Sequence, residues 1–292
     1  MLYISLIWLI LGVNTYLAKA SGLSILNFNT IVKYNILRNF WAIFFALCLA
    51  LIGGEKLDLN ITMFLSAATL GSVTAIDLFM ELMLSKTSTT ALSNIIHRGG
   101  VVIASSLAGI FLFNNPVNPI QWVFFALFMM ASYMLCGASK EIYKSFSLKS
   151  VLMLLTHALC GGLAAISLQV FAKTNDGNNN MFLALAYTVT QVLLLLIFPF
   201  LRFKPEEKGA KIPLKFKYFA LMMGIVLALN QLFTVFAARV LDPIVQFSLI
   251  AVGGIAVSML VGILFFKEKI TVKSGIAVAV SALSVVMINY FN

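Results

Sequence analysis

Five ionisable residues lie inside long apolar stretches of this sequence, where a charge needs a specific physical reason. They are Asp77, Glu81, His97, Arg98 and His157. An ionised side chain at the centre of a bilayer costs about 3 kcal/mol or more, so such residues mark substrate sites, ion pathways or paired structural charges. These five residues are therefore the first candidates for binding chemistry.

Asp77 and Glu81 are four residues apart, so a helix places both carboxylates on one face. Arg98 lies roughly seven to nine residues into the next apolar stretch, and Asn94 precedes it by one helical turn. A short connection joins the two stretches. We therefore expect the two helices to pack antiparallel and Arg98 to reach Asp77.

Three interpretations of these charges remain open. Arg98 and Asp77 could form a buried pair that only fixes helix packing. Alternatively, the planar guanidinium of Arg98 binds a carboxylate or phosphate of a substrate, for which it is better suited than an ammonium group. In the third interpretation, Asp77 or Glu81 receives a cationic substrate or a coupling proton. We favour a cavity-lining role for at least one of Asp77 and Arg98.

His97 and His157 could titrate near neutrality and carry protons. A lone intramembrane histidine more often makes one structural hydrogen bond, and this is the interpretation we favour for each. Gln246 is a weaker polar candidate. The predicted substrate-binding residues are Asp77, Glu81, Asn94, His97, Arg98, Asn230, Gln231, Asn14 and Trp8.

The composition shows what elements must position these side chains. Hydrophobic residues make up 61% of the 292 residues and charged residues 10%, with a mean hydropathy of +1.02. A spanning helix needs about 20 apolar residues. Ten stretches qualify: 2–18, 34–54, 63–84, 91–113, 120–136, 150–172, 181–201, 216–237, 244–266 and 272–290. We predict an all-α integral membrane protein with ten transmembrane helices and no extramembrane domain.

The segment 92–122 is echoed about 153 residues later. The matches include Gly100 with Gly253, Ser105 with Ser258, Leu107 with Leu260, Gly109 with Gly262, Ile110 with Ile263 and Phe113 with Phe266. Two tandem copies with an odd number of spans must be inverted relative to each other, a common plan of secondary transporters. We predict two five-helix repeats, residues 1–145 and 146–292. At the same offset Asp77 meets Asn230, Glu81 meets Thr234 and Arg98 meets Ala251, so the predicted site is charged on one side only.

Basic residues are distributed unequally between the two sets of predicted loops. Sixteen Lys and Arg residues lie near the loops that follow odd-numbered spans, Lys33 and Arg38 among them, and three lie on the other side. Cytoplasmic loops carry the excess of Lys and Arg, so both termini are expected outside the cytoplasm and the chain in the plasma (inner) membrane. We expect the first span to be retained, because the segment 17–20 resembles the segment 171–174 at the end of the sixth span. The net charge of +10 is explained by these basic residues at the ends of spans, so it does not indicate binding to nucleic acid.

The second half of the chain resembles a known repeat. The residues that carry the resemblance are Leu241-Asp242-Pro243-Ile244, Gly253, Gly262, Phe266-Lys267-Glu268-Lys269 and Gly275. They are similar to the end of an EamA-type repeat of the drug/metabolite transporter (DMT) superfamily, and in the first copy Asn114-Asn115-Pro116 replaces the charged turn. The resemblance implies a ten-helix carrier with a central cavity for small metabolites such as amino acids, amines, nucleosides or sugar phosphates.

The sequence leads to three hypotheses about function. The leading hypothesis is a secondary transporter of a small polar metabolite, driven by an ion gradient or by exchange. A lipid flippase or scramblase of the same fold is the alternative. An enzyme is disfavoured because no metalloprotease, nucleophile-elbow or nucleotide-binding motif is present. The three cysteines lie within apolar stretches, so neither a disulfide framework nor a metal site is expected. The expected partners are a small-molecule substrate, the lipid bilayer and a proton or counter-substrate, with no cofactor, in a monomer or homodimer.

Overall fold

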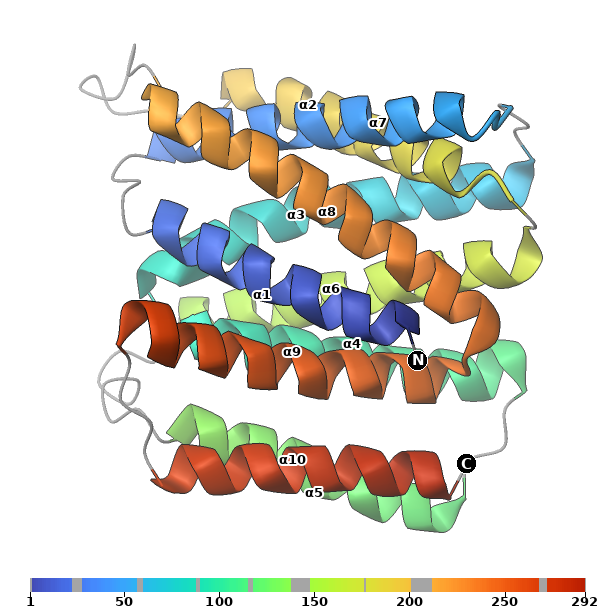
Figure 1. Cartoon of the computed structure of the whole chain (residues 1–292), viewed down its shortest axis with the longest axis vertical. Coiled ribbons are helices and arrows are strands. Elements are labelled where there is room, and N and C mark those ends of the chain that lie inside the picture. Colours follow the sequence, from blue (N-terminus) through green and yellow to red (C-terminus); the bar gives the residue numbers. More distant parts are fainter. Residues whose placement is uncertain are drawn as a thin grey trace.

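The computed structural model describes residues 2–22, 28–56, 60–87, 90–114, 118–137, 148–175, 177–200, 212–267 and 272–291. All regular elements in these ranges are helices, which confirms the prediction of an all-helical chain (Figure 1). The helices are α1 (Leu2–Gly22), α2 (Phe28–Ile52), α3 (Ile61–Thr87), α4 (Thr90–Phe113), α5 (Pro119–Gly137), α6 (Leu148–Thr174), α7 (Asn179–Ile197), the short 3₁₀ helix η2 (Phe198–Phe200), α8 (Leu214–Val240), α9 (Pro243–Phe266) and α10 (Val272–Tyr290).

Local sequence explains several helix ends. α5 begins at Pro119 and α9 begins at Pro243, where the missing proline N–H would have no intrahelical partner anyway. α4 and α9 each end before a residue with a left-handed backbone, Asn114 at φ 52° and Lys267 at φ 54°. This conformation terminates a helix because the next N–H turns back to the last free carbonyls. Glu268, Lys269, Asn115 and Pro116, the rest of the two compared turns, lie outside the described residues.

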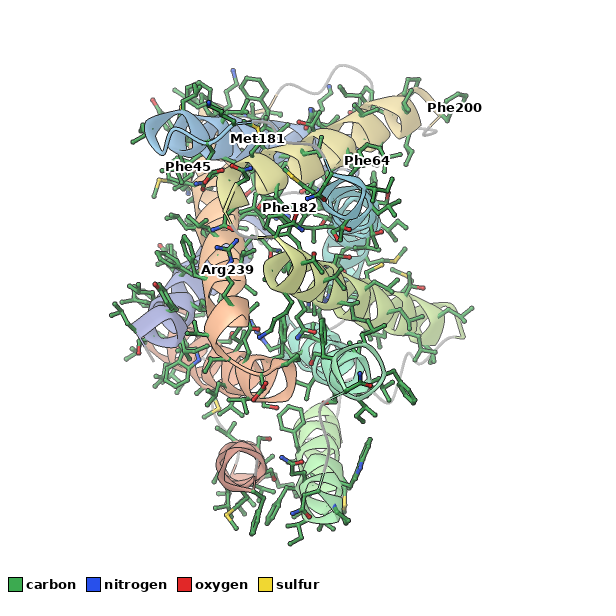
Figure 2. All side chains as sticks on the ribbon, turned by 90° about the vertical axis from the view of Figure 1, so that its right-hand side faces the viewer. Phe45, Phe64, Met181, Phe182, Phe200 and Arg239 are labelled. Carbon is green, nitrogen blue, oxygen red and sulfur yellow. The ribbon has the colours of Figure 1, made fainter. Side chains whose placement is uncertain are left out.

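Seven segments of the described chain are long and apolar enough to cross a membrane, so the chain has the helices of a multi-pass membrane protein. They are 2–20, 29–52, 61–80, 151–174, 179–200, 214–240 and 245–266. Large apolar side chains cover the outside of the bundle: Phe64 is 48% and Phe200 85% exposed, and Phe200 lies at the outer edge of the molecule in Figure 2. A surface of this kind is stable in contact with lipid tails and costly in contact with water.

The two halves of the chain have matching helix bounds. α3, α4 and α5 begin and end at positions that recur 153 residues later as the bounds of α8, α9 and α10. The packing partners correspond too: α1 packs against α8 and α9, and α6 packs against α3 and α4. In Figure 1 the colours show that α1 and α6 run in opposite directions, and both termini lie at one end of the helices.

Two details differ from the sequence-based expectations. α2 begins at Phe28 rather than near Tyr34, so Lys33 belongs to the helix, and Arg38, which was counted with the basic residues near the loop, lies well inside it. α3 and α4 make little direct contact, because α6 from the second half of the chain lies between them (Figure 1). The expectation that the short connection makes α3 and α4 pack against each other is therefore wrong.

Small residues allow the helix backbones to approach closely. A Cβ built on Gly100 of α4 would lie 2.7 Å from the Ala158 Cα of α6. A Cβ on Gly162 of α6 would lie 2.6 Å from the Ala104 Cβ of α4. Between helices in lipid, close packing of this kind takes the place of a hydrophobic driving force.

Side chains also cross-link the connections at the helix ends. The Arg239 guanidinium at the end of α8 donates to the Asn175 carbonyl at 2.9 Å and to Asn179 Oδ1 at 2.7 Å (Figure 2). Glu55, after α2, accepts hydrogen bonds from Asn180 Nδ2 at 2.7 Å and from the Met181 backbone N–H at 2.9 Å. The Glu55 carboxylate thus acts as a cap for the first turn of α7, where free N–H groups and the helix dipole favour negative charge.

Replacing Glu55 by Ala is expected to lower the free energy of unfolding by about 1 kcal/mol, the usual cost of losing a helix cap. Glu55→Gln should cost less because its amide oxygen still accepts a hydrogen bond. Unfolding of the purified protein in detergent, followed by circular dichroism, measures both. Equal stability of Glu55→Ala and wild type would contradict the capping role.

Candidate functional site

A cavity of about 200 Å³ lies among α1, α2, α3, α4, α6, α8 and α9. Its polar lining residues are Asn14, Arg38, Thr74, Asp77, His97, Arg98, His157, Asn230, Gln231 and Thr234. At about 30 Å³ per molecule it has room for several waters or for one small metabolite. The cavity therefore combines a small volume with a concentration of charge that is rare inside apolar helices.

Matched positions of the two halves line this cavity. Six pairs separated by 153 residues line it with both members: Leu11 and Ala164, Thr74 and Leu227, Asp77 and Asn230, Leu78 and Gln231, His97 and Ile250, and Arg98 and Ala251. The backbone positions thus correspond while the chemistry does not. The charged members of these pairs come from the first half, as the sequence offset predicts.

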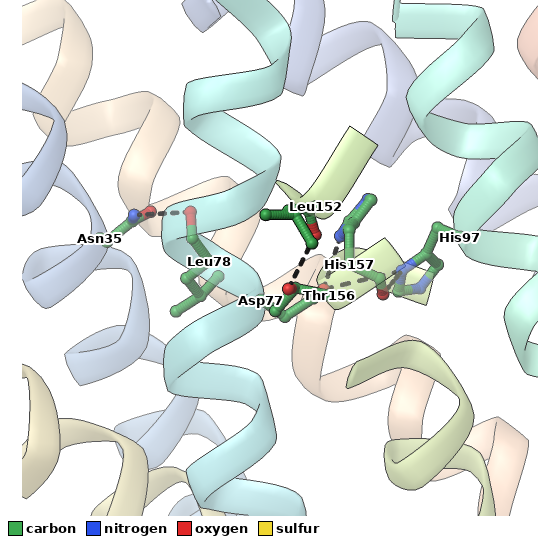
Figure 3. A network of polar contacts seen from close by, with 7 residues as sticks. All are labelled: Asn35, Asp77, Leu78, His97, Leu152, Thr156 and His157. Atoms are coloured by element: carbon green, nitrogen blue, oxygen red, sulfur yellow. Dashed lines mark hydrogen bonds and ion pairs between the residues drawn. The ribbon is translucent and has the colours of Figure 1, made fainter. Parts of the chain in front are cut away.

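Asp77, His97 and His157 form a cluster on one wall of the cavity (Figure 3). His157 Nδ1 lies 2.6 Å from Asp77 Oδ1, and His97 Nδ1 lies 3.7 Å from the same oxygen. His97 Nδ1 also lies 3.2 Å from the His157 backbone carbonyl, and the two imidazole rings are 4.3 Å apart between centroids. The His157 side chain is 4% exposed, whereas those of Asp77 and His97 are 25% and 27% exposed.

Each residue of this cluster comes from a different helix. Asp77 is on α3, His97 on α4 and His157 on α6, which lies between the other two. Gly161, one turn after His157, makes room for the His97 ring, because a Cβ there would lie 2.6 Å from His97 Cε1. The three side chains offer ligand atoms within 4.8 Å of one another and thus form a group that could hold a metal ion or protons. The proximity of these three side chains could not be predicted from the sequence, because residues from three helices have no fixed spacing along the chain.

Arg98 does not pair with Asp77, contrary to our expectation. Within the described part of the chain its guanidinium makes no hydrogen bond or ion pair, and its buried Nε has no partner. The carboxylate of Asp77 is instead engaged by the histidines, since α6 separates α3 from α4. The guanidinium lies over Gly254 of α9, where a Cβ would come within 2.7 Å of Nη1. Arg98 therefore brings positive charge and N–H donors to the cavity, with no acceptor among the described residues.

Arg38 is a cavity residue that the sequence analysis assigned to a loop. It is 5% exposed, lies on α2 and lines the same cavity. Asn35, one turn before Arg38, and Asn39, directly after it, are buried as well. This spacing of three buried polar residues on one helical face was the signal that could have placed Arg38 inside the bundle.

The remaining candidates fall into three groups. Asn14, Asn230 and Gln231 line the cavity. Trp8 does not line it: its Nε1 donates to the Leu249 carbonyl at 3.0 Å, and its ring packs on Gly253. The side chains of Glu81 and Asn94 lie outside the described residues. Gln246 is buried beside the cavity and donates to the Thr234 carbonyl at 2.7 Å, which is a structural role.

Comparisons with known proteins reveal the fold and no activity. No protein-family model matches the chain, and no curated protein matches it. The chain is similar to a solved structure described only as "Crystal structure of protein", with a TM-score of 0.70 and 14% sequence identity over 99% of this chain and 95% of that chain. The fold and the site together define a protein whose described residues form multiple apolar helices of spanning length around a charged cavity.

Proposed function

We propose that this protein is a secondary transporter of a small polar metabolite, working by alternating access between two inverted five-helix repeats, residues 1–145 and 146–292. The matching bounds of α3 to α5 and α8 to α10 support the duplication. The opposite directions of α1 and α6, and their reciprocal packing against the other half, support the inversion (Figure 1). On the sequence resemblance, we place it in the drug/metabolite transporter superfamily.

The observation that carries this proposal is the cavity at the interface of the two halves. Transporters with inverted repeats bind substrate where the repeats meet, because rocking of one half against the other then exposes the same site to either side. Matched positions from both halves line the cavity, and Arg98 lies in it with no hydrogen-bond or ion-pair partner among the described residues. We propose that Arg98 receives an acidic group of the substrate, since a guanidinium forms paired hydrogen bonds with a carboxylate or phosphate.

The proposed topology has ten transmembrane helices, with both termini outside the cytoplasm, in the plasma (inner) membrane. Placing Arg38 inside the bundle removes it from the loop count, yet the loops after odd-numbered helices keep a large excess of Lys and Arg. Transport would be driven by an ion gradient or by exchange, because the sequence has no nucleotide-binding loop.

Counterflow in proteoliposomes tests this function. Vesicles holding the purified protein are preloaded with one unlabelled compound from a panel of amino acids, organic acids, amines, nucleosides and sugar phosphates, and uptake of the same labelled compound is measured. Accumulation above that of protein-free vesicles is expected for at least one acidic or zwitterionic member. If no compound of the panel shows counterflow and a fluorescent phospholipid is scrambled in the same vesicles, the transporter hypothesis is rejected in favour of a flippase or scramblase.

A further inference from the structure

We propose that Asp77, His97 and His157 form a proton-binding site, and that its proton is taken up together with an acidic substrate bound at Arg98. This inference rests on the proposed transport function and names its coupling ion and substrate class. It would make the protein a proton–anion symporter. The proposal depends on the hydrogen-bond geometry of the cluster, on the charges around it, and on the position of both sites in one cavity.

The cluster geometry favours a proton over a metal ion. Asp77 Oδ1 and His157 Nδ1 are 2.6 Å apart, the distance of a charge-assisted hydrogen bond that shares one proton. Two ligands of a tetrahedral metal with bonds of about 2.0–2.2 Å would lie over 3 Å apart. His97 Nδ1 contacts a backbone carbonyl at 3.2 Å, and a carbonyl can only accept, so this nitrogen carries a hydrogen. The three facing atoms are thus arranged to hold protons.

The charges around the cluster determine whether a bound anion strengthens or weakens proton binding by the histidines. Among the described residues, the titratable and charged groups that line the cavity with Asp77 come from α2, α4 and α6: Arg38, His97, Arg98, His157 and Cys160. α1 presents the uncharged Asn14, and α7 presents no residue to the cavity. With neutral histidines, the described lining residues contribute two arginines and one carboxylate, and together they carry a net positive charge. A bound anion offsets this charge, and a further proton on the histidines then meets less repulsion.

The same coupling acts in both directions. If an anion favours protonation of the histidines, protonation must strengthen anion binding by the same factor, because linkage between two binding sites is reciprocal. Both sites open to one cavity, so the anion and the proton are loaded from one side and released to the other. A cationic substrate would compete with the proton at Asp77 and produce exchange instead.

Two histidines in the entire sequence make a direct test possible. Protein labelled with ¹³C and ¹⁵N at histidine should give two imidazole spectra in detergent micelles, assigned with His97→Gln and His157→Gln. We expect both to change protonation in a coupled manner between about pH 5 and 8, the range in which imidazole titrates. Asp77→Asn should alter the titration of both, whereas Asp242→Asn, an exposed carboxylate before α9, should alter neither. Histidines that stay in one protonation state throughout would overturn the proton site.

Acetate serves as a minimal carboxylate probe for the coupling. When acetate replaces chloride at constant pH and ionic strength, the wild-type histidine signals should move toward their protonated positions, and those of folded Arg98→Gln should not. An equal response in Arg98→Gln, or no response in wild type, would overturn the coupling. Saturation of both imidazoles by equimolar Zn²⁺ would overturn the proton assignment in favour of a metal. A normal histidine titration with no counterflow would instead retain the proton site and reject transport.

Discussion

Arg98→Gln is expected to weaken binding of the acidic substrate by at least about 30-fold, since removing one partner of a buried charge pair costs roughly 2–5 kcal/mol. The empty variant should be as stable as wild type or more stable, because the guanidinium has no acceptor within the described residues and its desolvation is uncompensated. A thermal-shift titration of both proteins with the substrate found by counterflow measures the two effects together.

Two further arginine variants make this experiment specific. Arg98→Lys keeps the charge and loses the planar fork, so intermediate affinity is expected. Arg239→Gln removes an arginine whose guanidinium is bound to Asn175 and Asn179 away from the cavity, so it should lower stability and leave substrate affinity unchanged. Unchanged affinity in Arg98→Gln would exclude Arg98 from substrate binding. Asp77 and Arg38 would then be the charged candidates for that role. A large loss of stability in empty Arg98→Gln would show that Arg98 has a structural role instead.

Gly100→Leu is expected to have the largest effect on the fold. The Gly100 Cα faces the backbone of Ala158 on α6, and even a single Cβ would come within 2.7 Å of the Ala158 Cα. Backbone cannot yield as a flexible side chain can, so α4 and α6 must separate. Overpacking of this kind costs typically 1–3 kcal/mol, and more where helices have to move apart. We expect loss of a monodisperse peak in size-exclusion chromatography, or a marked fall in melting temperature.

Gly275→Leu is the matched control for this substitution. Gly275 is also in a helix, α10, and a Cβ there would meet no described atom within 4 Å. Leucine should therefore be tolerated, with a small gain from its better helix propensity. If Gly100→Leu behaved like Gly275→Leu, the close contact between α4 and α6 would be wrong. The position of His97 beside His157 would be wrong as well, because it depends on the same packing of α4 against α6.

The separation of α4 and α6 should also affect the cavity in milder variants. Gly100→Ala places only the Cβ against Ala158, and it should shift α6 enough to lengthen the hydrogen bond between His157 and Asp77. In the labelled protein the two imidazole signals should then change more in Gly100→Ala than in Gly275→Ala. Identical histidine spectra in the two alanine variants would show that helix packing and the proton site are independent.

Helix positions were predictable from sequence because each depends on a contiguous run of residues. The described helices follow the predicted apolar stretches closely, and α10 has the predicted bounds, Val272–Tyr290. The exception is α2, which begins six residues early, because Asn29, Thr30 and Lys33 are too polar to count as part of an apolar stretch. Local polarity was misleading there because tertiary packing buries Asn29 and Thr30.

The sequence by itself determined that the chain is helical, that its surface suits lipid, and which polar residues interrupt the apolar helices. These properties depend on composition and on short-range order. Only the tertiary structure decided which of those polar residues meet. α6 lies between α3 and α4, so His157 takes the place beside Asp77 that the sequence assigned to Arg98. Partner choice between charges depends on helix order in space, which no spacing along one chain specifies, and this order leaves Arg98 facing the cavity.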